Sequence, residues 1–260
     1  MRRSRRAPLL TARLPRAALF FAGVAAVAAV CFAAVTGSSR DVCAIVFITA
    51  GCASALAHCA VTRSRSSAAG LLVVTAGLGL ASEAASDRTG WPFGRLAYTS
   101  TLGYRVLDVP LVAALGWTML AWLAFVVASR LTSSARGAVL LGAWTLTALH
   151  LLVDPQVTAA GHLTWKTDRL LFDGVPALGY LGVLAISLLM MLTLWVVIPR
   201  PSTRRPDDRV VSALFLGGFL AVELSALFVY DLPSTALVGA AGVGVVAVPY
   251  AATIAGFRLR

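Results

Sequence analysis

Residues 109–127 read VPLVAALGWTMLAWLAFVV and contain no charged side chain. A bilayer core of about 30 Å requires roughly 20 apolar residues when the backbone is helical. The run is therefore long enough to cross a membrane as a single helix. It lacks the polar–apolar alternation of a strand in a membrane β-barrel, which would also be about half as long.

The rest of the chain repeats this pattern. Similar apolar runs lie on both sides of the quoted run, and the third and fifth runs are the shortest. The approximate spans are 17–35, 42–61, 68–82, 109–127, 137–153, 176–198, 210–229 and 234–256. They predict an all-α fold, a polytopic transmembrane helical bundle of about eight spans.

The composition agrees with a membrane protein. Of the 260 residues, 59% are hydrophobic and 13% are charged, against about 45–50% and about 25% in a soluble domain. So few charges cannot cover a water-facing surface, which excludes a soluble globule, a disordered chain and a secreted disulfide scaffold. We predict a basic N-terminal segment at residues 1–16 and a single integral-membrane domain at residues 17–257.

The net charge of +11 indicates membrane orientation. When the loops are assigned alternately to the two sides, 16 basic residues fall on the side of both termini and 6 on the other side. Cytoplasmic loops are enriched in Lys and Arg. We therefore predict cytoplasmic termini and a multi-pass protein of the cell membrane. The partner that this basic excess indicates is the lipid bilayer and not nucleic acid.

The first apolar run has an alternative interpretation. It follows an arginine-rich segment, and Ser4-Arg5-Arg6 resembles part of a twin-arginine signal. A signal peptide, however, has a shorter apolar region, and here a second span follows at once. We predict that the first run is a retained span.

Most acidic residues fall on the predicted outer face, where two long loops are expected at residues 83–108 and 154–175. Both loops mix aromatic residues, glycines and prolines, which is typical of loops with a function. Glu83 stands at the outer end of the third run, where a carboxylate is costly unless it faces the bundle interior. Asp87 shares its face if the helix continues. A solvated helix end is the alternative for both.

Aromatic residues gather in the first of these loops. Thr89, Trp91 and Phe93 belong to the turn TGWPFG at residues 89–94, and Tyr98 follows. Glycine and proline favour a tight, rigid turn. Such a turn could hold aromatic side chains over a buried pocket, or the same residues could form an interfacial belt.

The fifth and seventh runs supply further candidates. Asp154 and Pro155 end the fifth run, and His150 lies four residues before Asp154 on the same helical face. This pair could relay a proton, or His150 could be hydrogen-bonded within the bundle. Glu223 lies well inside the seventh run. Burial would favour its neutral form, which suits a general acid, although a structural hydrogen bond to a neighbouring helix is the alternative.

Several common chemistries lack their motifs. The four cysteines lie in the first two runs, with no CxxC pair and no histidine at zinc spacing. The chain has no P-loop, no dinucleotide fingerprint and no Gly-x-Ser-x-Gly turn. We therefore expect no metal and no cofactor.

Two ordered blocks of residues carry a family resemblance. The first block is Glu83-x-x-Ser86-x-x-Thr89-Gly90-x-Pro92-Phe93-Gly94-x-x-x-Tyr98, followed by Leu102-Gly103, Val109-Pro110 and Trp117. The second block is Asp154-Pro155, Gly161, Trp165 and Gly174-Val175-Pro176. Over roughly residues 70 to 185, the chain resembles membrane carotenoid-biosynthesis proteins. These are the cofactor-independent carotenoid hydratases that act on gamma-carotene or on the C50 precursor of bacterioruberin.

The resemblance implies addition of water to a terminal double bond of a carotenoid, started by proton transfer from a carboxylic acid. The candidate catalytic residues are Glu83, Asp87, Asp154, Glu223 and His150. The candidate substrate-binding residues, most of them aromatic and able to stabilise a cation, are Thr89, Trp91, Phe93, Tyr98, Trp117 and Trp165. The expected partner is a carotenoid or other polyisoprenoid substrate that enters from the lipid between helices. No particular oligomeric state is implied.

Two other classes of protein fit the same topology. A non-catalytic membrane protein could bind or move a lipid or pigment, and a terpenoid end-group cyclase could use the same acids. A small-ion transporter fits less well, because only Glu223 lies well inside a span. The sequence also has no evident internal repeat that would favour an inverted-repeat transporter.

Overall fold

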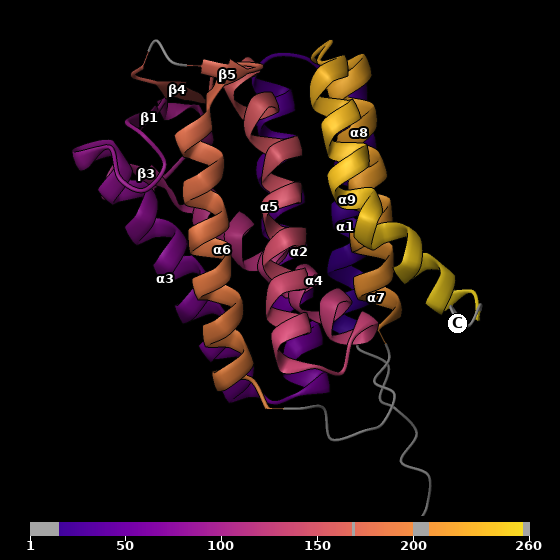
Figure 1. The fold of residues 1–260 in the computed structure, drawn as a ribbon. Helices are drawn as coiled ribbons and strands as arrows, with labels where there is room; N and C mark the ends of the chain where they lie inside the picture. Colours follow the sequence, from indigo (N-terminus) through magenta and orange to yellow (C-terminus); the bar gives the residue numbers. More distant parts are fainter. Residues whose placement is uncertain (1–15, 168–169, 200–207, 257–260) are drawn as a thin grey trace, which may run out of the picture.

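The computed structural model describes residues 16–167, 170–199 and 208–256. In this part of the chain eight helical spans are long and apolar enough to cross a membrane, which confirms the all-α polytopic bundle. Figure 1 shows the helices side by side, with short strands gathered at one end. We call this end the cap end; it corresponds to the predicted outer face. The predicted N-terminal segment lies outside the described residues, except for Arg16.

The helices have the following bounds. They are α1 (Arg16–Ala34), α2 (Ser38–Thr62), α3 (Arg65–Thr89), α4 (Leu111–Leu131), α5 (Ala135–Ala159), α6 (Ala177–Val197), α7 (Arg209–Ser212), η2 (Ala213–Gly217), α8 (Gly218–Phe228) and α9 (Pro233–Ile254). The segment η2 is π-helical and joins α7 to α8, so these three elements form one span.

The strands and one short helix all belong to the cap. They are β1 (Leu96–Tyr98), the 3-10 helix η1 (Ser100–Leu102), β2 (Arg105–Val106), β3 (Val109–Pro110), β4 (Leu163–Trp165), β5 (Leu170–Phe172) and β6 (Val175–Pro176). Strands β2 and β3 form one hairpin, and β5 and β6 form another. Strand β1 pairs antiparallel with β4, with Leu96 opposite Trp165 and Tyr98 opposite Leu163. This pairing joins the two loops that the sequence predicts separately.

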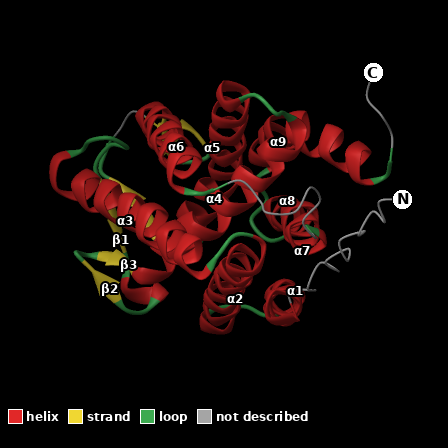
Figure 2. Cartoon of the chain, turned by 90° about the horizontal axis from the view of Figure 1, so that it is seen from below, coloured by secondary structure: helices red, strands yellow, loops and turns green. Residues whose placement is uncertain are grey.

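Helix α4 lies at the centre of the bundle. It packs against α2, α3, α5 and α9, and the view along the bundle in Figure 2 shows it surrounded by them. The quoted run is apolar around the whole helix, and a helix without a polar face is stable only where neighbours or lipid cover it. Here Trp117 and Trp122 are both buried against neighbouring helices. The run that predicts the fold is therefore also its core.

Helix α3 extends beyond the apolar run at 68–82, as required by the alternative in which Asp87 shares a helical face with Glu83. It continues past Glu83 to Thr89 and ends where Gly90 adopts a left-handed conformation with φ +81°. Glycine reaches this conformation without steric cost, which makes it a common helix terminator. The predicted loop at 83–108 is thus a loop only from Gly90 onward, and Glu83 lies on a helix.

Helix α5 also extends further than predicted. It runs through Pro155 to Ala159, because proline removes only one backbone donor and the following residues keep their helical hydrogen bonds. The Ala160 backbone N–H, for example, donates to the Gln156 carbonyl oxygen at 2.8 Å. The predicted loop at 154–175 therefore begins only at Ala160, and Asp154 lies on a helix.

The cap is built from a local repeat that the sequence analysis did not detect. Each copy begins with a helix that carries a carboxylate seven residues before a glycine in the left-handed conformation. A strand follows, then a hairpin whose turn contains an aspartate at positive φ, and then a Val-Pro pair that leads into a second helix. The antiparallel β1–β4 pair is centred on Ala97 and Thr164, as expected for a local twofold axis. Equivalent residues are Glu83 and Asp154, Gly90 and Gly161, Leu96 and Leu163, Asp108 and Gly174, Pro110 and Pro176, and Gly116 and Gly182.

The docking of α6 under the cap depends on Gly182. A Cβ atom at this position would collide with the Pro92 carbonyl oxygen and would lie 2.7 Å from Phe93 Cδ1. We expect Gly182→Ala to lower the free energy of unfolding by about 1–3 kcal/mol, as overpacking does in a close-packed core. Thermal unfolding of the purified protein in detergent measures this change.

Gly77→Ala is the matched control for this substitution. A Cβ at Gly77 in α3 would have no atom within 4 Å. Alanine is the better helix former by about 1 kcal/mol, so this variant should be as stable as the parent or more stable. An equal loss of stability in Gly182→Ala and Gly77→Ala would contradict the role of Gly182 in the docking of α6.

Candidate active site

A cavity of about 150 Å³ lies beneath the cap, between α2, α3, α4, α5 and the η2–α8 segment. Most of its lining is apolar. The ionisable side chains that line it are Glu83, Tyr98, His150 and Asp154, and all four come from the cap end of their helices or from the cap itself. The cavity therefore has a reactive end and an apolar remainder.

Glu83 is buried and is held by Trp117. Trp117 Nε1 donates a hydrogen bond to Glu83 Oε1 at 2.7 Å, and the residue is only 6% exposed. Its Oε2 has no hydrogen-bond partner among the described residues. The close approach of α4 to α3 depends on Gly79, because a Cβ there would lie 2.5 Å from Trp117 Cδ1. One carboxyl oxygen is thus fixed, and the other is available to a ligand.

His150 and Asp154 form a pair on α5. His150 Nδ1 lies 3.0 Å from Asp154 Oδ1. An ionised carboxylate can only accept, so Nδ1 carries the proton and a neutral ring leaves Nε2 as an acceptor. Within the part of the chain that the structure describes, buried Nε2 has no partner. The ring centroid of His150 lies 4.0 Å from that of Trp117, which brings the pair beside Glu83.

Tyr98 reaches the same site from β1. Its side chain interacts with the Glu83 carboxyl group. Burial raises the pKa of Tyr98 well above its usual value, and the nearby Glu83 and Asp154 raise it further. The hydroxyl therefore stays protonated and acts as a donor toward the carboxyl group.

Aromatic rings close the reactive end. Phe93 stacks on Trp117 with ring centroids 6.2 Å apart and an angle of 15° between the planes. The Ser86 hydroxyl accepts a hydrogen bond from the Phe93 backbone N–H at 2.9 Å, which ties the turn to α3. Trp165 lines the cavity from β4, the strand that pairs with β1. The rings thus come from both halves of the cap.

The structure brings together seven of the candidate residues around this cavity. They are Glu83, Phe93, Tyr98, Trp117, His150, Asp154 and Trp165. The four that do not line it lie elsewhere. Asp87 forms an ion pair with Lys166 at 3.6 Å, Thr89 accepts from the Trp91 backbone N–H, and Trp91 is 68% exposed. Glu223 is buried between α5, α8 and α9, with Oε1 close to Gly239.

A family model for carotenoid biosynthesis proteins matches residues 42–248. The chain belongs to this family. The match extends on both sides of the resemblance noted at residues 70–185, and it includes every residue that lines the cavity. No curated protein and no solved structure matches the chain. Family membership gives the protein a role in carotenoid biosynthesis, and its eight apolar spans make it a multi-pass membrane protein.

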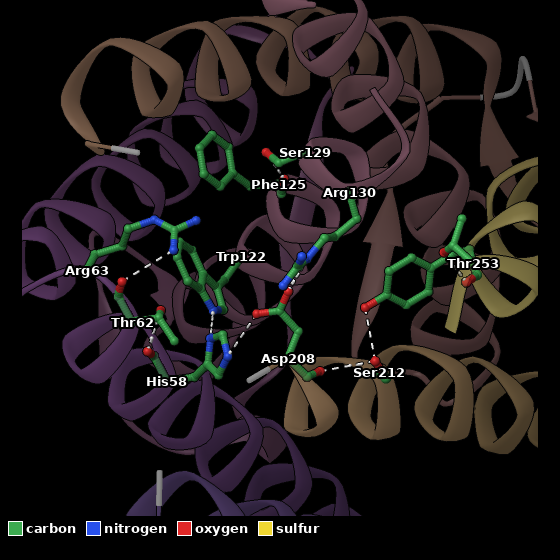
Figure 3. Close-up of polar contacts among 11 residues, drawn as sticks. His58, Thr62, Arg63, Trp122, Phe125, Ser129, Arg130, Asp208, Ser212 and Thr253 are labelled. Carbon is green, nitrogen blue, oxygen red and sulfur yellow. Dashed lines mark hydrogen bonds and ion pairs between the residues drawn. The ribbon is translucent and has the colours of Figure 1, made fainter. Parts of the chain in front are cut away.

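A second polar cluster, shown in Figure 3, lies at the opposite end of the bundle. Trp122 Nε1 donates to His58 Nδ1 at 3.2 Å, and His58 Nε2 lies 3.4 Å from Asp208 Oδ1. Arg130 also pairs with Asp208. This cluster was not predicted from the sequence, although a histidine inside an apolar run is itself a signal. It ties α2 and α4 to the start of the α7–η2–α8 span.

Asp208 should give the protein a pH-dependent stability. Burial raises the pKa of Asp208, but hydrogen bonds from His58 and Arg130 and the charge of Arg130 lower it more, so the net pKa lies below the usual 3.8. A depressed folded-state pKa stabilises the fold above the unfolded-state pKa, and this contribution is lost as the pH falls through the folded-state value. We expect Asp208→Asn to cost about 1–3 kcal/mol at neutral pH.

Melting temperatures measured at several pH values test this expectation. The difference in melting temperature between the parent protein and Asp208→Asn should be largest near neutral pH and should shrink as the pH falls below about 4. Asp231→Asn is the control, because Asp231 is exposed. A difference in melting temperature between the parent and Asp208→Asn that does not change with pH would contradict the proposed contribution of the ion pair to stability.

Proposed function

We propose that the protein is a carotenoid hydratase that adds water to a terminal carbon–carbon double bond. The supporting observation is that the buried Glu83 carboxyl group and the buried His150 ring, which is paired with Asp154, both contact Trp117 at the same end of an apolar cavity. Hydration of an alkene requires one group that gives a proton and one that takes a proton. Glu83 and His150 fit these two roles.

Glu83 is the proposed acid. An alkene is a very weak base, so protonation requires a neutral carboxylic acid in a site that excludes bulk water. Burial among apolar side chains favours that neutral form. The Glu83 Oε2–H bond breaks, a new C–H bond forms at the less substituted alkene carbon, and the other carbon becomes a tertiary cation. Trp117 Nε1 remains hydrogen-bonded to Oε1 and stabilises the resulting carboxylate.

His150 is the proposed base. A water molecule next to Nε2 attacks the cation through its oxygen while Nε2 takes one of its protons. The product is a tertiary alcohol, and the overall change is the addition of one water molecule. His150 then carries a proton that Glu83 lacks, so the proton returns to Glu83, directly or through water, before the next turnover. Asp154 holds the ring in the required tautomer.

The aromatic residues protect and stabilise the cation. The faces of Trp117, Phe93 and Trp165 can interact with positive charge within about 6 Å. They also limit the entry of other water molecules. We place this site toward the predicted outer face of the membrane, with the polyene entering from the lipid.

Glu83→Gln should lower the hydration rate by about 100- to 10,000-fold, the usual contribution of a general acid. The assay expresses each variant in a host that accumulates a carotenoid with an acyclic end and measures a product heavier by one water by mass spectrometry. Protein amounts are compared in the same membranes. Asp87→Asn and Glu223→Gln should retain activity, because neither residue lines the cavity; full activity in Glu83→Gln would remove Glu83 from the mechanism.

Asp154→Asn should also lower the rate by about 100-fold or more, for a different reason. An asparagine amide can donate to Nδ1 and so favour the tautomer with a proton on Nε2, which cannot accept a proton from water. The variant should keep its melting temperature within a few degrees and lose product formation in the same assay. Unchanged activity would show that His150 does not act as the base.

The same assay separates the two alternatives. A cyclase would leave the mass of the pigment unchanged and alter its absorption spectrum. A non-catalytic binding protein would leave both mass and spectrum unchanged. Either result for the parent protein across several acyclic-ended substrates would overturn the proposed function.

A further inference from the structure

We infer that the polyene chain of the substrate lies in an apolar groove between α2 and the η2–α8 segment, with Gly116 and Gly218 on its walls. This inference rests on a polyene substrate, as in the proposed function, but not on the hydration step. We call this feature the polyene groove. Its other walls are formed by Phe47, Ile48, Leu120, Leu123, Leu214 and Phe219.

The size of the cavity supports this placement. Cavities that enclose a whole drug-sized ligand measure about 300–1,000 Å³, and a carotenoid is larger than most such ligands. The cavity beneath the cap measures about 150 Å³. It can therefore hold only one end of the molecule, which is the end group beside Glu83 and the adjoining part of the polyene, and the rest of the rigid conjugated chain has to leave between helices.

The lining residues show the direction in which the polyene leaves the reactive end of the cavity. On α4 the cavity is lined from Val112 to Leu123, about 17 Å at 1.5 Å per residue. On the α7–η2–α8 span it is lined from Leu214 to Val222. Every groove residue away from the cap end is apolar. The groove thus runs from the reactive end toward the middle of the bundle.

The groove lies along the seam between α2 and α8, and α1 packs against both of these helices. These two helices hardly touch each other, and Phe47 and Phe219 are only partly buried although both line the cavity. The π-helical η2 supplies part of this wall, and π-helical segments occur frequently at functional sites. In the proposed arrangement the polyene reaches the surrounding lipid along this seam, beside α1.

Two glycines keep the groove open. A Cβ at Gly218 would lie 3.9 Å from Phe47 Cζ, and a Cβ at Gly116 would lie 3.7 Å from Ile48 Cγ2. Both distances are ordinary contacts, so a methyl group fits while a larger side chain would fill the groove. Gly217, the adjacent residue, is exposed, and a Cβ there would meet no atom within 4 Å. It is the matched control position.

Pigment binding tests the groove separately from catalysis. Each substitution is made in the parent chain and in the Glu83→Gln background, expressed in a host that accumulates an acyclic-ended C40 carotene, and purified in mild detergent. Bound pigment per protein is measured by absorbance, and bound acyl lipid by mass spectrometry. Gly218→Phe and Gly116→Leu should lower bound pigment roughly tenfold or more, as expected for overpacking of a binding site.

The controls should retain pigment. Gly218→Ala adds only a methyl group, and Gly217→Phe places the same ring one residue away on an exposed position. All variants should elute as a single species in size-exclusion chromatography. Bound pigment without a product heavier by one water in the parent would reject the hydratase and leave the groove intact.

Four outcomes would overturn the groove. These are no pigment on the parent or on Glu83→Gln, equal pigment on Gly218→Phe and the parent, equal losses in Gly218→Phe and Gly217→Phe, or a Gly218→Phe variant that loses bound acyl lipid but keeps its pigment. The last result would show that a membrane lipid, and not the polyene, occupies the seam.

Discussion

The hydrogen bond from Trp117 to Glu83 is the interaction on which the site depends. It joins the central helix α4 to α3 at 2.7 Å, and Gly79 makes the close approach possible. The Trp117 ring then contacts His150 of α5 and Phe93 of the cap. One indole therefore sets the positions of the proposed acid, the proposed base and an aromatic wall. A carboxyl group buried among apolar helices is costly unless it is hydrogen-bonded, which explains why this donor is needed.

The local repeat explains why two separate helices each supply a carboxylate. Glu83 and Asp154 stand at equivalent positions, seven residues before the glycines that end α3 and α5. Pairing of β1 with β4 brings the two copies together at the cap end. The copies then differ where chemistry requires a difference. Position 150 holds a histidine while its equivalent is Gly79, so one carboxylate receives an imidazole partner and the other receives Trp117.

The sequence predicted the bundle because apolar run length depends only on the bilayer thickness. The placement of Glu83, His150 and Asp154 inside the bundle was also predictable, since ionisable residues in spans are unfavourable without a role or a partner; their catalytic roles stay predictions. The ends of α3 and α5 were predicted too early, because Glu83 and Pro155 resemble helix ends in isolation. The placement of Asp87 and Glu223 outside the cavity, and the cluster around His58, depend on contacts between distant segments. A single sequence does not report such contacts.

The separation of the two polar ends limits what the cavity can do. Ionisable groups line it only near the cap, and the His58–Asp208 cluster lies at the opposite end of the described bundle. Between them the lining is apolar, so no continuous polar path joins the two ends through this cavity. An ion would have to cross that apolar stretch without a partner, which is strongly unfavourable. A long apolar molecule with one end to be modified meets no such cost, because its end reaches Glu83 while its chain stays among apolar side chains.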